Sequence, residues 1–353
     1  MVILSEKDNS KEIEINKNML RDRAKKLPEV TDEMWNEVNK EFRDLVSEYI
    51  ASQSHSPQTK KQYLSMLRQF GWFICSSLNN KPIYKIKKRD IIRYLSYLRD
   101  DRRMSPSAIG TRKAVISSLC NYIENVVMDD FDDDEENPYK NFRNFTRGLP
   151  AIPKSSVYEK IKITKDEYLE MMKVLEDDEN YLGMAWLATA FNTGARRNEI
   201  IQFKSEIATY EIDENATYIM SHNVRLKGRG EDGKIEPYMV NFEALKYIKL
   251  WLEKRGYDHE YIFTKKYGDE IKVVEEGWAN YLCSSVLSHI LERRINPHLF
   301  KASAVTYLLE QGVPLELVSK FVAHHENVAT TIAHYDLRDH AEEKNNIFGS
   351  LNT

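Results

Sequence analysis

The sequence predicts a mainly α-helical protein in which an N-terminal four-helix domain is followed by an α+β domain with a small antiparallel sheet. The chain has 353 residues, of which 42% are hydrophobic and 30% charged, so it is long enough for two compact units. Four segments with helical apolar spacing come first, and two strand-like segments among helical ones come later. We predict an arm over 1–35, a helical domain over 36–137, a linker over 138–160, a second domain over 161–340 and a tail over 341–353.

The four predicted helices of the first domain have apolar residues spaced along one face. The first starts at Trp35, the second at Ser56-Pro57, the third near Lys88 and the fourth at Ser105-Pro106. A serine followed by a proline is typical of a helix start, because the hydroxyl caps free backbone N–H groups and proline fits the first turn. Helices of this length form a small bundle.

Charge is distributed unevenly along the first domain. The net charge of −4 argues against indiscriminate nucleic-acid binding. However, residues 60–113 contain 14 Lys or Arg against three Asp, whereas residues 129–136 (DDFDDDEE) are almost wholly acidic. The acidic run indicates a solvated loop, and the basic run indicates either solvated helix faces or a DNA-contacting surface. The candidate DNA-contacting residues are Lys60, Lys61, Arg68, Lys87, Lys88, Arg112 and Lys113, with Arg229 from the second domain.

The second domain alternates helical and strand-like segments. A run of prolines, one glycine and basic residues without a clear period, from Asn137-Pro138 to Pro153, predicts the linker before it. A capping box (TKDE) opens its first helix, and the next helix is apolar and ends at Thr193-Gly194. Two strands separated by a basic, turn-rich stretch predict a hairpin or a short three-stranded sheet. The predicted strands are 216–221 and 236–240, the turn-rich stretch is 225–234, and the predicted later helices are 242–253, 279–293, 298–311 and 315–322.

Four segments of the second domain contain residues suited to cutting DNA. Breaking a strand while conserving its bond energy needs a nucleophile that stores the phosphodiester, cations that neutralise charge on phosphorus, and an acid for the leaving oxygen. Tyrosine, arginine, lysine and histidine supply all three. Taken singly, each segment also has a structural explanation, as a helix cap, a solvated turn, a helix surface or a packing residue. The candidate catalytic residues are Arg196, Lys227, His298, Lys301, His324, His325 and Tyr335.

Taken together, the four segments resemble the catalytic domain of the tyrosine recombinase (phage integrase) family. TGARRNEI is similar to the family's Thr-Gly-x-Arg-x-x-Glu box, which implies that Arg196 is the first catalytic arginine and that Glu199 supports it. RLKGRGEDGKIEPY is similar to the family's hairpin lysine motif and implies a catalytic role for Lys227. The segment SPQTKKQY at 56–63 resembles the family's helical core-binding (SAM-like) domain.

The last part of the resemblance covers the segment from His298 to Tyr335. HLFKASAVTYLLEQGVPLELVSKFVAHHENVATTIAHY is similar to the family's His-x-x-Arg-His-Thr helix, Leu-Gly-His turn and nucleophilic tyrosine. The chain departs from that pattern at the second arginine, which is Lys301, and at Ala302 and Ala323. Lysine keeps the positive charge and lacks the planar fork that binds two phosphate oxygens.

The sequence leaves open which residue corresponds to the histidine of the family's Leu-Gly-His turn, called the late histidine below. Counting back from Tyr335 and from Thr330-Thr331 favours His325, whereas counting forward from Gly312 favours His324.

The resemblance implies a site-specific DNA recombinase that forms a 3′-phosphotyrosyl intermediate, needs no cofactor or metal, and acts as a homo-tetramer on double-stranded DNA. The alternative is a DNA-binding regulator, such as a repressor, that keeps the fold and has lost cleavage. No window of the sequence approaches the roughly 18 consecutive apolar residues that a membrane span requires, and the N-terminus becomes charged too soon for a secretory signal. We therefore expect a cytoplasmic protein without a membrane partner.

Overall fold

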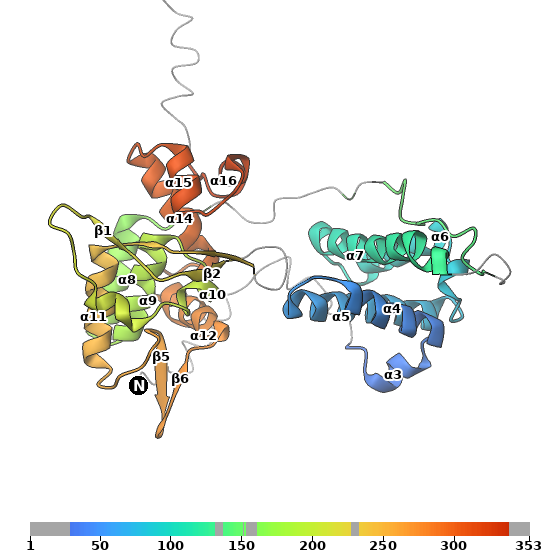
Figure 1. Ribbon diagram of the computed structural model, residues 1–353, viewed down its shortest axis with the longest axis horizontal. Coiled ribbons are helices and arrows are strands. Elements are labelled where there is room, and N and C mark those ends of the chain that lie inside the picture. The colour runs from blue at the N-terminus through green and yellow to red at the C-terminus, as the bar shows by residue number, and fades with distance from the viewer. Residues whose placement is uncertain (1–28, 131–136, 151, 153–160, 227–232, 339–353) are drawn as a thin grey trace, which may run out of the picture. The chain divides into compact units, whose positions relative to one another are not determined.

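The computed structural model describes residues 29–130, 137–150, 152, 161–226 and 233–338. The described residues form two compact units, one up to residue 152 and one from residue 161 onward (Figure 1). Among the helices within these ranges, none combines the length and the apolar character that a membrane crossing requires.

The first unit is an all-helical bundle. Its longest helices, α5 and α7, begin as predicted, with the Ser56 and Ser105 hydroxyls accepting a backbone hydrogen bond and a proline in the first turn. Helix α4 packs against both, and Phe42, Tyr49, Phe70 and Tyr94 are buried among them. The helices are α3 (Asp32–Glu37), α4 (Lys40–Ser52), α5 (Pro57–Ser77), α6 (Lys88–Ser96) and α7 (Pro106–Asn125), with short turns η1 (Ile83–Lys85), η2 (Tyr97–Asp101) and η3 (Val127–Asp130).

The prediction of one helix starting at Trp35 is wrong. Trp35 belongs to α3, and the chain is extended at Val38 before α4 begins. The break is stabilised locally, because the Asn39 side chain accepts from the N–H of Phe42, and its own N–H donates to Asn80 Oδ1 at 2.9 Å. The end of the predicted arm is also part of this unit, since Val30 is buried.

The prediction that the linker starts at residue 138 is wrong as well. Tyr139, Phe142 and Phe145 are buried in the core of the first unit. The buried Asn144 amide donates to the side chains of Ser117 and Asn121. These aromatic side chains have no helical spacing, yet they anchor an irregular segment to the helical unit. The remaining predicted domain boundaries stay predictions.

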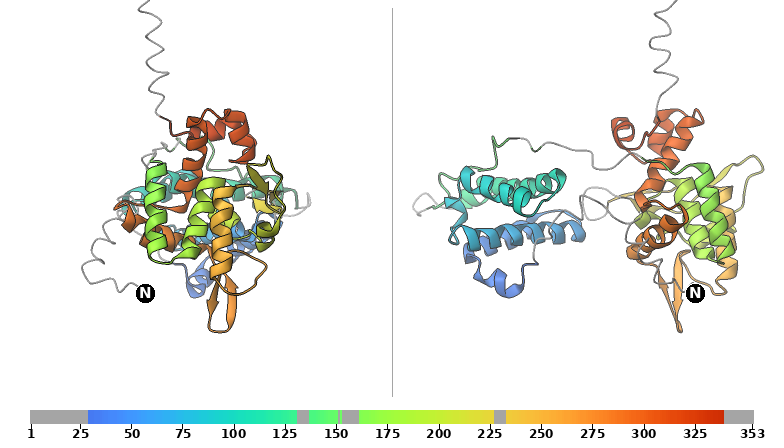
Figure 2. Two further views of the ribbon diagram at one scale, coloured as in Figure 1. Left: turned by 90° about the vertical axis from the view of Figure 1, so that its left-hand side faces the viewer. Right: turned by 180° about the vertical axis from the view of Figure 1, so that it is seen from behind.

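The second unit is organised around α9, which is apolar on all sides. It packs against α8, α11 and α14 (Figure 2), and a helix covered on every face needs no polar stripe. Trp186 is fully buried at its centre. The helices are α8 (Lys165–Asp177), α9 (Tyr181–Thr193), α10 (Arg197–Ile200), α11 (Phe242–Lys254), α12 (Glu276–Tyr281), α13 (Ser288–Ile290), α14 (Pro297–Glu310), α15 (Leu315–Phe321) and α16 (Val328–His334), with η4 (Ser205–Thr209) and η5 (Leu282–Leu287).

The strands of this unit form three antiparallel pairs. They are β1 (Tyr218–Met220) with β4 (Met239–Asn241), β2 (Val224–Leu226) with β3 (Lys234–Glu236), and β5 (Thr264–Tyr267) with β6 (Glu270–Val273). The predicted strand 236–240 is in fact two strands with different partners, which are separated at Pro237, a residue without a backbone N–H for pairing. Strand β2 lies partly in the stretch predicted as turn-rich, the β5–β6 hairpin was not predicted, and the predicted helix 279–293 is divided by the π-helical segment η5.

Candidate active site

Tyr335 lies at the end of α16 and is surrounded by side chains from other elements. Tyr335 is 7% exposed. Its backbone carbonyl accepts a hydrogen bond from the Thr306 hydroxyl of α14 at 2.9 Å. The ring centroid of Tyr335 is 5.4 Å from that of His298 and 4.7 Å from that of His325. Lys301 Nζ is 6.0 Å from the Tyr335 ring centroid. Three predicted site residues therefore meet around the tyrosine.

Arg196 reaches the same site from α10. Helix α9 ends at Gly194, whose φ of 64° is left-handed and suits glycine. A side chain there would also approach Val322 Cγ1 to 3.2 Å. Two residues later Arg196 caps α10, with its N–H 2.6 Å from Glu199 Oε2 and its guanidinium Nη1 2.9 Å from Glu199 Oε1. The guanidinium also interacts electrostatically with Tyr335.

Glu199 is a buried carboxylate that holds Arg196 in place. Besides its two bonds to Arg196, it accepts a hydrogen bond from the Tyr238 hydroxyl at 2.6 Å. Burial by itself would raise the pKa of Glu199, but the charges of Arg196 and Lys301 and the Tyr238 hydroxyl hold this pKa below its ordinary value. Glu199 therefore stays ionised and fixes one edge of the guanidinium.

Lys301 is fully buried, and its Nζ lies near the Tyr335 ring. Its Nζ donates a hydrogen bond to the Gly194 carbonyl at 3.2 Å. Burial, followed by repulsion from Arg196, lowers the pKa of Lys301 to about 7. The amine therefore changes between its protonated and neutral forms near neutral pH, whereas an arginine in this place would stay protonated.

The two adjacent histidines have different surroundings. His325 lies beside Tyr335, and its Nδ1 is 2.9 Å from the Thr331 hydroxyl, which in turn donates to Ser319 Oγ. Burial, followed by the charges of Lys301 and Arg196, lowers the pKa of His325 to about 4, so the ring is neutral at pH 7. His324 instead places Nδ1 2.7 Å from Glu236 Oε2 and packs its ring against Tyr238.

The remaining predicted site residues lie either outside the described residues or in the first unit. Lys227 and Arg229 lie outside the described residues. In the first unit, Arg68 donates to the Val30 and Thr31 carbonyls and to Asp32, and Arg112 donates to the Ala108 carbonyl and to Gln69. Both arginines therefore stabilise the bundle itself. Of the lysines in this set, Lys61, Lys87 and Lys88 are exposed, and Lys60 and Lys113 are half-buried.

Glu236 and Tyr238 contact the cluster and were not predicted to do so. Tyr238 bonds to Glu199, and Glu236 bonds to His324. They lie on either side of Pro237, Glu236 as the last residue of β3 and Tyr238 just before β4. No signal in the sequence indicated their role, because it depends on how these strands meet the turn after α15.

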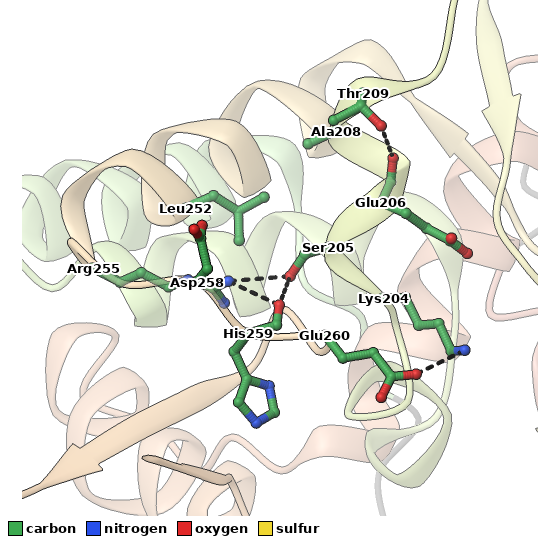
Figure 3. A pocket seen from close by; sticks show the side chains of 10 residues that line it. All are labelled: Lys204, Ser205, Glu206, Ala208, Thr209, Leu252, Arg255, Asp258, His259 and Glu260. Atoms are coloured by element: carbon green, nitrogen blue, oxygen red, sulfur yellow. Dashed lines mark hydrogen bonds and ion pairs between the residues drawn. The ribbon is translucent and has the colours of Figure 1, made fainter. Parts of the chain in front are cut away.

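A separate hollow of about 590 Å³ lies between η4 and the end of α11 (Figure 3). Arg255 donates there to Ser205 Oγ and to the His259 carbonyl, and Lys204 pairs with Glu260. None of the predicted site residues lines it. Its main polar groups are already paired with one another, so we assign it no function.

We predict that Tyr238→Phe lowers the free energy of unfolding by about 1–3 kcal/mol, because the buried Glu199 carboxylate loses a hydrogen-bond donor. Urea denaturation measures the change. Tyr218→Phe is the matched control, since Tyr218 lies on β1 and is 44% exposed, and it should unfold like the wild type. Equal stability of both variants would show that the Tyr238 hydroxyl does not support Glu199.

Comparison with known proteins identifies the family. The model of the phage integrase family matches residues 162–342, and that of the phage integrase N-terminal SAM-like domain matches residues 42–130. The chain is 61% identical over 335 residues to the SPbeta prophage-derived recombinase-like protein YomM of Bacillus subtilis (strain 168), covering 95% of this chain and 98% of that protein. This chain belongs to the phage integrase family. The predicted family and the predicted recombinase function are thereby confirmed.

More distant relatives of this phage integrase family member are also recombinases or integrases. It is 25% identical over 285 residues to tyrosine recombinase XerC of Staphylococcus aureus (strain NCTC 8325 / PS 47), which covers 78% of this chain and 85% of that protein. The structure of the XerH site-specific recombinase bound to palindromic difH substrate matches with a TM-score of 0.66 at 15% identity, covering 93% of this chain and 99% of that chain. The Tn1549 transposon integrase in complex with transposon right end DNA matches with a TM-score of 0.61 at 15% identity, covering 88% and 99%. These likenesses confirm the predicted fold class.

Proposed function

We propose that this site-specific recombinase cuts DNA with Tyr335, whose phenolic oxygen attacks the scissile phosphate. The phenol loses its proton to solvent as its oxygen bonds to phosphorus, the bond from phosphorus to the 5′ oxygen breaks, and the 3′ end stays attached as a phosphotyrosyl ester. The observation that supports this is the convergence of Arg196, Lys301, His298 and His325 around one tyrosine. Cations placed where phosphorus gains negative charge stabilise the transition state.

Each residue of the cluster has a distinct proposed role. Arg196 contacts the non-bridging phosphate oxygens, and Glu199 orients it. His298 donates a hydrogen bond to the phosphate from the exposed side of α14. His325 takes the late-histidine role, because its neutral ring lies against Tyr335 and Thr331 fixes its Nδ1. Lys227 protonates the leaving 5′ oxygen.

Lys301 replaces the family's second arginine in this proposal. Its amine neutralises charge near phosphorus only while it is protonated, and burial brings its pKa to about 7. The reaction should therefore depend on pH in a way that an arginine-containing site would not.

We predict that the second-order rate of covalent-complex formation by the wild type falls about tenfold between pH 7 and pH 8.5, because Lys301 is charged below its pKa and neutral above it. Glu199 stays ionised and His325 stays neutral over this range, so neither explains the fall. The pH dependence of a second-order rate, measured below saturation, reports the pKa values of the protein before it binds DNA.

Lys301→Arg is the matched control for this pH dependence, since its guanidinium stays charged. We expect it to cleave at least as well as the wild type at pH 7 and to lack the fall. Dividing the wild-type rate by the Lys301→Arg rate at each pH cancels the effect of titrating groups that both proteins share. A ratio that does not change with pH would contradict the assignment of Lys301.

Duplex DNA is the proposed substrate, and the two domains together would clamp it. Phosphate contacts would supply affinity and a few base contacts would supply sequence choice. Exposed Lys61, Lys87 and Lys88 are the best-placed candidates of the first unit. We propose a homo-tetramer on two DNA sites, acting in the cytoplasm during integration or excision of a mobile element.

A DNA-binding regulator without cleavage activity is the second candidate function. It is favoured by one observation, namely that Lys301 gives its hydrogen bond to the Gly194 carbonyl in a fully buried position. Duplexes selected by the full chain from a randomised library, then nicked next to the cleavage position, distinguish the two functions. A trapped covalent complex supports the recombinase, and tight binding without an adduct supports the regulator.

A further inference from the structure

His324 has a backbone conformation that is energetically unfavourable for a histidine. Its φ is 52°, in the left-handed region where residues other than glycine are uncommon. The side chain is 4% exposed, and its buried Nε2 has no hydrogen-bond partner among the described residues. Backbone strain and an unpartnered buried nitrogen in one residue are typical of a functional position.

The contacts of His324 join two parts of the site. Its Nδ1 bonds to Glu236, the last residue of β3, at 2.7 Å. Its ring packs edge-on against Tyr238 with centroids 4.4 Å apart, and the Tyr238 hydroxyl holds Glu199. Its sequence neighbour is His325, whose ring lies against Tyr335. His324 therefore connects β3 to the turn that carries the histidine beside the tyrosine.

Strand β3 is the far strand of the hairpin that carries the lysine motif. Glu236 pairs with Val224 of β2 at the base of this hairpin, and residues 227–232, including Lys227, connect the two strands in sequence. The Glu236 carboxylate also pairs with Lys234 on its own strand. A bond from the turn to Glu236 therefore fixes the base of this hairpin.

We infer that His324 is a positioning residue which, through Glu236, sets the base of the β2–β3 hairpin relative to Tyr335 for protonation of the leaving 5′ oxygen. The inference rests on the proposed function and adds to it a residue pair that acts through the hairpin rather than on the phosphate. A displacement of about 1 Å at a catalytic group costs on the order of a hundredfold in rate, so loss of this pair should be measurable.

The test compares two nicked duplexes that differ at one atom. In one, the leaving atom at the scissile phosphate is the natural 5′ oxygen, and in the other it is sulfur. A thiolate leaves without being protonated, so a defect in proton delivery disappears on the sulfur substrate. The variants are His324→Gly, which suits the left-handed backbone, and Glu236→Ala. The control is Glu270→Ala, because Glu270 of β6 also pairs with a lysine two residues away.

We expect His324→Gly and Glu236→Ala to cleave the oxygen substrate about tenfold to a hundredfold more slowly than the wild type, and the sulfur substrate at nearly the wild-type rate. Hydrogen exchange of the backbone amides of β2 and β3 should be faster in both variants, which reports the loosened hairpin independently of cleavage. Glu270→Ala should match the wild type in all three measurements.

Wild-type rates on both substrates for the two variants, or equal slowing on both substrates, would overturn the inference while leaving the proposed function intact. If the wild type cleaves neither substrate, the proposed function itself fails, and the inference fails with it.

Discussion

Tyr335→Phe is expected to abolish covalent attachment to DNA, lowering its rate by at least about a thousandfold, because phenylalanine has no oxygen to attack phosphorus. The fold should persist. The Tyr335 ring packs in a small apolar cluster with Ala302, Val305 and Val322, and its backbone, not its hydroxyl, bonds to Thr306. Denaturing electrophoresis of protein mixed with a labelled nicked duplex measures attachment.

DNA affinity serves as the internal control for Tyr335→Phe. Binding of an intact duplex, measured by fluorescence anisotropy, should stay within about threefold of the wild type, because phosphate contacts spread over many cations supply most of the affinity. An adduct formed by the phenylalanine variant at the wild-type rate would show that another residue is the nucleophile.

Arg196→Ala is expected to have two effects. The rate of cleavage should fall by about a hundredfold to a thousandfold, as it does when a preorganised donor to a charged transition state is removed. The free energy of unfolding should also fall, by about 3 kcal/mol, because the buried Glu199 carboxylate loses its partner. Cleavage assays and thermal unfolding measure the two effects separately.

Two further variants separate catalysis from stability at this position. Arg196→Lys retains a charge beside Glu199 and should regain part of the stability, while cleavage stays low because lysine lacks the bidentate fork. Arg197→Ala is the matched control, since Arg197 bonds to Glu276 and Asn280 on the surface. Normal cleavage by Arg196→Ala would remove this arginine from the site.

The parts of the fold that were predictable are those with local signals. Ser56-Pro57 and Ser105-Pro106 begin helices because hydroxyl capping and the fixed φ of proline act within one turn. Gly194 ends α9 for an equally local reason, its left-handed φ. These signals need no knowledge of the tertiary structure.

The errors occurred where tertiary contacts decide the structure. The break before α4 depends on Asn80, which is distant in sequence and accepts the Asn39 N–H. The aromatic side chains of Tyr139 and Phe142 bury a stretch whose prolines and glycine indicated a linker. The division of one predicted strand into β3 and β4 depends on two different partner strands.

The residues that cluster around Tyr335 could be nominated from the sequence, but their arrangement could not. The order of the motifs nominated Arg196, Lys301 and Tyr335, which the structure brings together. Counting along the chain left His324 and His325 equivalent, and only their surroundings separate them, because one ring faces Tyr335 and the other faces Glu236. The burial that shifts the Lys301 pKa is likewise a property of the folded chain.

Mass spectrometry of the wild-type protein trapped on a nicked duplex can locate the covalent bond between protein and DNA. The convergence of charged and polar groups around Tyr335 predicts one modified peptide, with the nucleotide attached to Tyr335. A nucleotide on any other residue, or no adduct from protein that binds the same duplex tightly, would contradict a DNA-cutting site built around this tyrosine.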